Sequence, residues 1–74
     1  MQNPRPGIYK HYKGGQYEVL GTAVHSETEE ELVVYRSLYG TYQLNVRPRK
    51  MFLDDVDRPD FKYKGPRFVL VKEF

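Results

Sequence analysis

Residues 8–20 read IYKHYKGGQYEVL, and this stretch decides the fold because a glycine pair separates two aromatic-rich runs. A two-residue Gly-Gly loop tolerates positive φ at both central positions and is typical of a tight β-hairpin. With the loop at Gly14-Gly15, the pattern predicts that Tyr12 lies opposite Tyr17. The chain therefore begins as a pair of antiparallel strands.

Further glycines mark the next changes of direction. Gly21 lies in the middle of the second run, where the lack of a side chain favours a bulge or a sharp bend. The residues Tyr39-Gly40-Thr41-Tyr42 are typical of a second tight hairpin, with glycine at the first central position of a type II′ turn. This turn brings the two tyrosines together and predicts that Arg36 lies opposite Asn45.

The run Leu32-Val33-Val34-Tyr35 is β-branched and aromatic and favours a strand, and the acidic stretch before it, residues 26–31, is predicted to be a loop. Because side chains alternate along a strand, one face holds Leu32, Val34 and Leu38. We take this leucine and valine face as the core. Tyr35 and Tyr39 are then expected to point outward.

Pro48 suits the first position of a short helical turn, because its missing amide hydrogen is not needed there. Met51 and Phe52, in this turn, are expected to plug one end of the fold. The polar stretch 54–64 is expected to cross the surface, and residues 67–71 to form the last strand.

These elements predict an all-β fold, a small five-stranded SH3-like barrel with one short helical turn. An OB-type barrel is the alternative, although it usually has a full helix between its third and fourth strands. We expect one domain over residues 1–74, with residues 1–6 as an extended N-terminal tail.

The composition narrows the class of protein. The chain has 74 residues and no cysteine, so it forms neither disulfides nor thiolate metal sites and its stability depends on apolar burial. Its N-terminal residues lack the apolar core of a signal peptide, and no apolar run is long enough to span a bilayer. We expect a soluble cytoplasmic protein without a membrane association.

Catalysis is disfavoured by geometry. His25-Ser26-Glu27 contains a base, a nucleophile and an acid, but neighbouring side chains of an extended segment point to opposite faces. We expect Ser26 and Thr28 to bond loop amides while His25 fastens the base of the loop. An enzyme that uses His25 or His11 as a general base stays the weakest alternative, and we expect no enzyme activity.

A metal centre and a cofactor are not expected either. The Gly14-Gly15 register pairs His11 with Glu18, far along the ladder from His25, and no cysteine or local cluster of ligands accompanies them. The stretch 54–57 resembles the start of a calcium loop, but the required glycine and closing glutamate are missing.

Binding is the favoured class of function. Tyrosines and arginines from neighbouring strands suit a protein or peptide ligand, or single-stranded nucleic acid bound through the basic block 36–50. The same cations could instead form an ion-pair network, with Arg36 or Arg47 reaching Glu27 or Glu31. The candidate ligand-binding residues are Tyr9, His11, His25, Glu27, Tyr35, Arg36, Tyr39 and Arg47.

Several of these motifs together resemble a known family. The segments are Gly7-Ile8-Tyr9-Lys10-His11-Tyr12-Lys13-Gly14, Tyr17-Glu18-Val19-Leu20-Gly21, His25-Ser26-Glu27-Thr28, Val33-Val34-Tyr35, Val46-Arg47-Pro48 and Met51-Phe52. They resemble the short bacterial domain of unknown function 1653. The resemblance implies a small SH3-like barrel in a bacterial cytoplasm and supplies no catalytic residues. Asn45 departs from the family pattern, in which tryptophan is frequent at this position, and Lys50 stands where an acidic residue is common.

Overall fold

The computed structural model describes residues 4–74, and strands dominate it. The elements follow in the order β1 (Gly7–His11), β2 (Gln16–Val24), β3 (Glu31–Ser37), β4 (Leu44–Pro48), α1 (Arg49–Phe52), β5 (Asp55–Arg58), η1 (Pro59–Phe61), β6 (Tyr63–Pro66) and β7 (Phe68–Glu73). The prediction of an all-β fold with one short helical turn is thereby confirmed.

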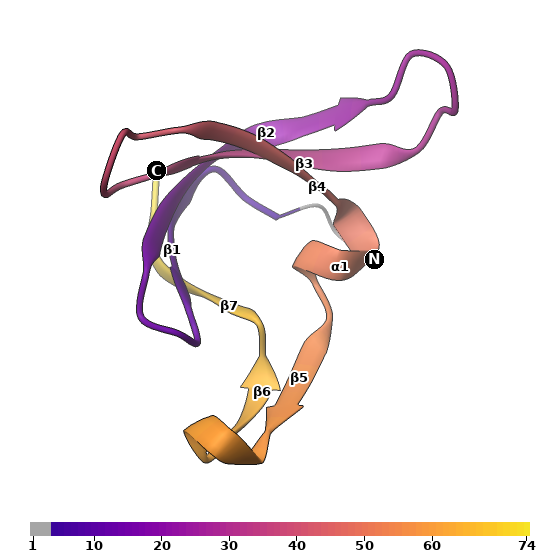
Figure 1. Cartoon of the computed structure of the whole chain (residues 1–74). Coiled ribbons are helices and arrows are strands. Elements are labelled where there is room, and N and C mark those ends of the chain that lie inside the picture. Colours follow the sequence, from indigo (N-terminus) through magenta and orange to yellow (C-terminus); the bar gives the residue numbers. More distant parts are fainter. Residues whose placement is uncertain (1–3) are drawn as a thin grey trace.

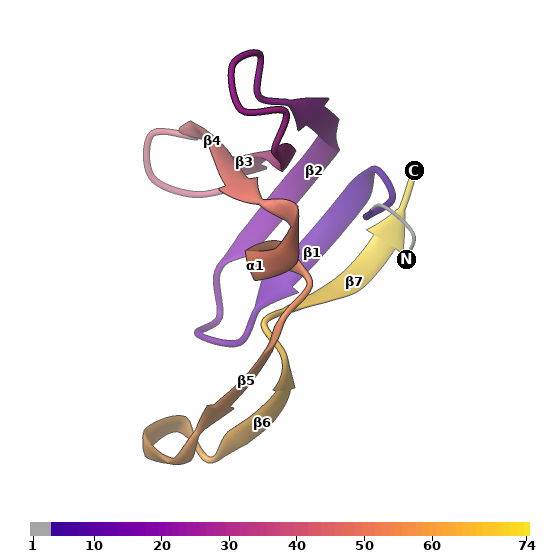
Figure 2. The same ribbon diagram turned by 90° about the vertical axis from the view of Figure 1, so that its right-hand side faces the viewer.

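The strands form two antiparallel sheets. The larger sheet has five strands in the order β4-β3-β2-β1-β7, and β5 pairs with β6 in a separate hairpin. The larger sheet curves around α1, while the β5–β6 hairpin extends away from it (Figures 1 and 2). The prediction of five strands in all is wrong, because the stretch 54–64, expected as a plain surface crossing, folds back on itself as a hairpin.

The first hairpin forms as predicted, but its register differs. The turn closes when the Gly14 amide donates to the His11 carbonyl at 2.8 Å, and Gly14 has φ of +107°. The loop thus consists of the three residues 12–14 instead of Gly14-Gly15, with Gly14 in the bulge position that glycine favours. As a result Tyr9, rather than Tyr12, lies opposite Tyr17, and His11 does not pair with Glu18.

The predicted bulge at Gly21 is confirmed, whereas the chain turns at Gly40 without the register of the predicted two-residue hairpin. The pairing of β2 with β3 shifts register between Val19 and Gly21, as expected for a bulge. In the β3–β4 turn the Tyr42 amide donates to the Tyr39 carbonyl at 3.1 Å. The register beyond this turn is displaced by one residue, because Arg36 lies opposite Leu44 instead of Asn45.

The core occupies the face of β3 opposite to the predicted one. Val33 and Tyr35 are buried, whereas Leu32 and Val34 are only half-buried on the other face. Both faces of this strand are apolar, so alternation alone could not identify the buried one. The expectation that Tyr35 points outward is wrong, and Tyr9 belongs to the same core. The core cluster consists of Tyr9, Val19, Val33, Tyr35, Phe52 and Phe68.

Helix α1 covers the concave face of the sheet through Phe52. This ring is 2% exposed and stacks on Phe68, with centroids 4.2 Å apart. It also contacts Tyr9 and Tyr35 edge to face. The prediction that Phe52 plugs the fold is confirmed, but Met51 is 49% exposed and takes no part in the core.

The β5–β6 hairpin is attached to the first turn through Tyr12. The Tyr12 ring stacks on Tyr63 with centroids 5.6 Å apart and contacts Phe61 edge to face. Arg58 donates to the Tyr12 hydroxyl at 2.7 Å. This contact places the hairpin beside the loop that carries His11.

The described part of the N-terminal tail is fixed to the sheet. Pro4 is buried, and the Arg5 carbonyl accepts a hydrogen bond from the Tyr9 hydroxyl at 2.9 Å. Residues 1–3 of the predicted tail lie outside the described residues. Over residues 4–74, no helix has both the length and the apolar character that crossing a membrane requires.

Candidate functional site

A hollow opens at the end of the sheet where the β1–β2 and β3–β4 turns meet. It has a volume of about 350 Å³, and we call it the tyrosine hollow. Its lining residues are His11, Lys13, Gly15, Tyr17 and Tyr39. The Gly14 bulge and the Tyr39–Tyr42 turn bring these residues together from separate parts of the sequence.

Two tyrosines join across the tyrosine hollow. The hydroxyl oxygens of Tyr17 and Tyr39 are 2.6 Å apart, and either hydroxyl is able to donate. Burial, followed by the hydrogen bond to Tyr39, raises the pKa of Tyr17 to about 12. The phenol of Tyr17 therefore stays protonated at neutral pH, and within the pair the hydroxyl that accepts has its own hydrogen free for a ligand.

His11 is held in one tautomer. Its Nδ1 accepts the Lys13 amide at 3.1 Å, so its proton resides on Nε2. The ring packs edge to face on Phe68 with centroids 4.9 Å apart. Burial lowers the pKa of His11, and the charges of Arg47, Arg67 and Lys13 lower it further.

Arg47 contacts two aromatic residues of this region, Tyr35 and Phe68. Its Nε donates to the Tyr35 hydroxyl at 3.3 Å, and its guanidinium carbon lies 5.7 Å from the Phe68 centroid. Arg67 is neutralised by Asp54, whose carboxylate accepts from its Nε at 2.7 Å. This hydrogen bond is the main reason that the pKa of Asp54 is lowered.

The structure brings three of the predicted site residues to this region, namely His11, Tyr39 and Arg47. Tyr9 and Tyr35 are core residues, and only the Tyr35 hydroxyl reaches the site, through Arg47. Arg36 is exposed on the opposite face of β3 and lies opposite Glu18. The predicted cluster is therefore divided among several surfaces.

His25 and Glu27 lie at the other end of β2, in the β2–β3 loop (Figure 1). The Nδ1 of His25 accepts the Glu27 amide at 3.1 Å, and the Thr28 hydroxyl accepts the Glu30 amide at 3.3 Å. The expectation that His25 fastens this loop is confirmed. The loop carries no contact between His25 and Ser26 of the kind that a catalytic pair requires.

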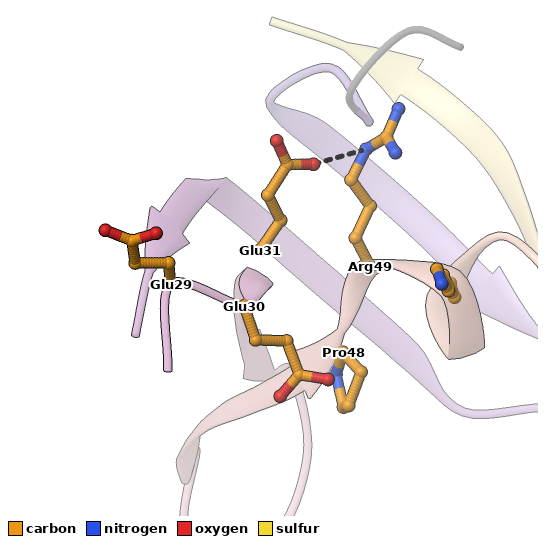
Figure 3. Close-up of a pocket in the computed structure, with 6 residues that line it drawn as sticks. Glu29, Glu30, Glu31, Pro48 and Arg49 are labelled. Atoms are coloured by element: carbon orange, nitrogen blue, oxygen red, sulfur yellow. Dashed lines mark ion pairs between the residues drawn. The ribbon is translucent and has the colours of Figure 1, made fainter. Parts of the chain in front are cut away.

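The acidic loop forms a second hollow of about 370 Å³ with the start of α1 (Figure 3). Its lining residues are Glu29, Glu30, Glu31, Pro48, Arg49 and Lys50. Here Arg49 Nε lies 3.5 Å from the Glu31 carboxylate, so Arg49 makes the ion pair that was expected of Arg36 or Arg47. Within the basic block 36–50, Arg49 is therefore paired with a carboxylate.

Sequence reasoning missed Lys13 and Tyr17, and the incorrect register explains the omission. With Tyr9 opposite Tyr17, both rings share the concave face with Val19 and Phe68. A three-residue loop ending in Gly14 would have placed Tyr17 there. Among residues 4–74 no group of three or more histidine and acidic side chains is arranged to hold a metal ion.

Asn45 contributes to the β3–β4 turn. Its side-chain amide donates to the Gln43 carbonyl at 2.8 Å and to the Ser37 hydroxyl at 3.3 Å. It lies opposite Tyr35 and is half-buried. The asparagine thus supports the turn that carries Tyr39.

Comparison with known proteins agrees with this fold. A crystal structure of a DUF1653 protein from Bordetella bronchiseptica is 38% identical and has a TM-score of 0.86, over 100% of this chain and 95% of that chain. No protein with a curated description matches the chain. The profile of the family described as protein of unknown function (DUF1653) matches residues 7–70. Because this match covers most of its length, the chain belongs to the DUF1653 family.

Proposed function

We propose that this DUF1653 domain is a non-catalytic binding module that takes an anionic group of a protein or peptide in the tyrosine hollow. One observation carries the proposal: besides Gly15, the lining residues of the hollow are a lysine, a histidine and two tyrosines, and none of them is acidic. A site of this composition attracts negative charge and offers hydrogen-bond donors to it.

The donors converge from different elements. His11 offers Nε2–H because its other nitrogen is occupied by the Lys13 amide. The phenol pair leaves one hydroxyl hydrogen for a ligand. Arg47 adds positive charge close by, since it contributes to the electrostatic environment of both His11 and Tyr17.

The aromatic surroundings favour a peptide over a free ion. Tyr17 contacts Tyr35, Tyr39 and Phe68 edge to face, and Tyr39 itself is 52% exposed. An exposed tyrosine offers a flat apolar ring together with a polar hydroxyl, a combination that is frequent at protein interfaces. A carboxylate flanked by apolar peptide surface matches both parts of this hollow.

A further part of the proposal is that the larger sheet is an SH3-like barrel. Its strand order is a meander from β1 to β4, with β7 returning beside β1 and a helical turn between β4 and β7. This connectivity is the one that an SH3-like barrel uses, with the β5–β6 hairpin as an addition. Such small barrels commonly bind peptides through aromatic surface residues.

The contacts of the two histidines support the non-catalytic part of the proposal. Each accepts a backbone amide at Nδ1, His11 from Lys13 and His25 from Glu27, so both stabilise turns. A general base needs a lone pair directed at its substrate, and here that lone pair is already engaged.

The test is a titration of ¹⁵N-labelled protein with a capped peptide rich in glutamate, followed by amide chemical shifts. We expect shifts at Lys13, Gly15 and Tyr39, and weaker binding of the same peptide with glutamine in place of glutamate. Lys13→Gln should weaken binding about two- to fivefold, as expected for one partly screened charge. Lys64→Gln, which removes an exposed lysine of β6, is the matched control.

Two results would contradict the proposal. One is equal binding of the glutamate and glutamine peptides. The other is a shift pattern centred on residues 29–31 and 48–50 instead of the tyrosine hollow.

A further inference from the structure

Strand β7 forms an open edge of the larger sheet. It pairs with β1 on one side only (Figure 2). Three consecutive apolar residues on it are exposed, with Val69 at 47%, Leu70 at 41% and Val71 at 55%. Natural sheets usually protect such edges with charges, prolines or covering loops. Between Phe68 and Val71 this strand has no charged residue and no proline.

A hollow of about 390 Å³ adjoins this edge. Its lining residues are Lys10, His11, Tyr12, Tyr63, Val69 and Val71. The two valines are separated by one residue, and Tyr12 and Tyr63, whose rings stack on each other, also line the hollow. The β5–β6 hairpin therefore completes a pocket next to unpaired backbone.

An open edge beside a side-chain pocket is the arrangement that supports strand addition, in which main-chain hydrogen bonds supply affinity and pockets select alternate side chains. We propose that β7 accepts an extended segment of a partner protein as a sixth strand, with apolar residues at alternate positions and a flanking acidic residue. This surface shares His11 with the tyrosine hollow, but the proposal does not depend on a ligand in that hollow.

The charges near this edge favour an acidic residue at the end of the partner segment. Lys10 lines the pocket, and Lys72 follows Val71 on the strand. The nearest carboxylate on β7, Glu73, is already paired with Arg5 at 3.1 Å. Within residues 4–74 neither Lys10 nor Lys72 forms an ion pair with a carboxylate, so an acidic partner segment is complementary in charge to this edge.

The other edge of the sheet is less suited to strand addition. Strand β4 also exposes apolar side chains, with Val46 at 59%. It ends at Pro48, which has no amide hydrogen to donate, and the neighbouring hollow is lined by three glutamates. Val46 thus provides a matched control on the same sheet.

The experiment uses a capped heptapeptide, Glu-Val-Thr-Val-Thr-Val-Glu, and measures affinity by calorimetry and amide hydrogen exchange on the labelled protein. We expect slower exchange for β7 amides. Val71→Lys should weaken binding about tenfold, the effect of losing one valine-sized contact. Val46→Lys and Tyr39→Phe should leave the affinity unchanged, and the latter separates this result from the tyrosine hollow.

Control peptides sharpen the result. Replacing both threonines by proline should abolish binding, and replacing both glutamates by lysine should weaken it. Three results would overturn the proposal: an affinity insensitive to Val71→Lys, a loss of binding in Val46→Lys, or self-association in sedimentation that Val71→Lys removes. The last result would assign the edge to a second copy of the chain.

Discussion

Truncation of Phe52 to alanine tests the feature on which the whole site depends, the contact between α1 and the curved sheet. Phe52 is 2% exposed and stacks on Phe68 at a centroid distance of 4.2 Å. Removing a buried phenylalanine costs about 3–5 kcal/mol through lost burial and the cavity left behind. At about 0.05–0.15 kcal/mol per residue, a chain of this length has roughly 4–11 kcal/mol in all.

Phe52→Ala should therefore remove a large part of the free energy of unfolding, measured by urea denaturation with circular dichroism. Met51→Ala is the matched control, because its side chain is adjacent but 49% exposed, and we expect a change below about 1 kcal/mol. If Phe52→Ala does not fold, Phe52→Leu supplies a smaller truncation, with an expected loss of about 1–2 kcal/mol. Equal effects of the Met51 and Phe52 truncations would refute the assignment of the core to the concave face.

Three further predictions concern the site and the sheet. Burial and nearby cations lower the pKa of His11, so the contribution of its neutral ring to stability is complete above about pH 6.5 and is lost as the pH falls through the lowered value. The free energy of unfolding of His11→Gln should therefore depend less on pH in this range. Identical pH profiles for the two proteins would contradict this view. Ring chemical shifts should give Tyr17 a pKa of about 12, and Tyr39→Phe should lower it; an unchanged value would show that the hydroxyl contact is not formed. Gly7→Ala should destabilise the protein by about 1–3 kcal/mol in chemical denaturation, because the new methyl group meets the Lys72 carbonyl; a neutral effect would argue against the pairing of β1 with β7.

The sequence was informative where a residue type has few structural alternatives. Gly21 marks a bulge, and Pro48 precedes the helical turn that buries Phe52. The turn closed by Tyr39 and Tyr42 was also predictable, since Gly40 adopts positive φ there. Such residues restrict the backbone locally, so distant contacts are not needed to interpret them.

Register and burial depended on contacts that no local pattern contains. The turn after His11 had two acceptable positions, and the three-residue difference in register between them places Tyr9, instead of Tyr12, opposite Tyr17. Strand β3 has two apolar faces, and the buried one is decided by Phe52 and Phe68, which lie far away in sequence. The strands β5 and β6 are polar and short, and their pairing is supported by the stacking of Tyr63 on Tyr12, a contact that no local pattern contains.

The ring of His11 contributes to the walls of two hollows, the tyrosine hollow and the pocket beside β7. A ligand that turns or protonates this imidazole in one of them alters the shape and charge of the other. Thermodynamic linkage then requires reciprocity: whatever factor the first ligand imposes on the affinity of the second, the second imposes on the first. Under the two proposals made above, the chain would read two chemical inputs through a single shared side chain.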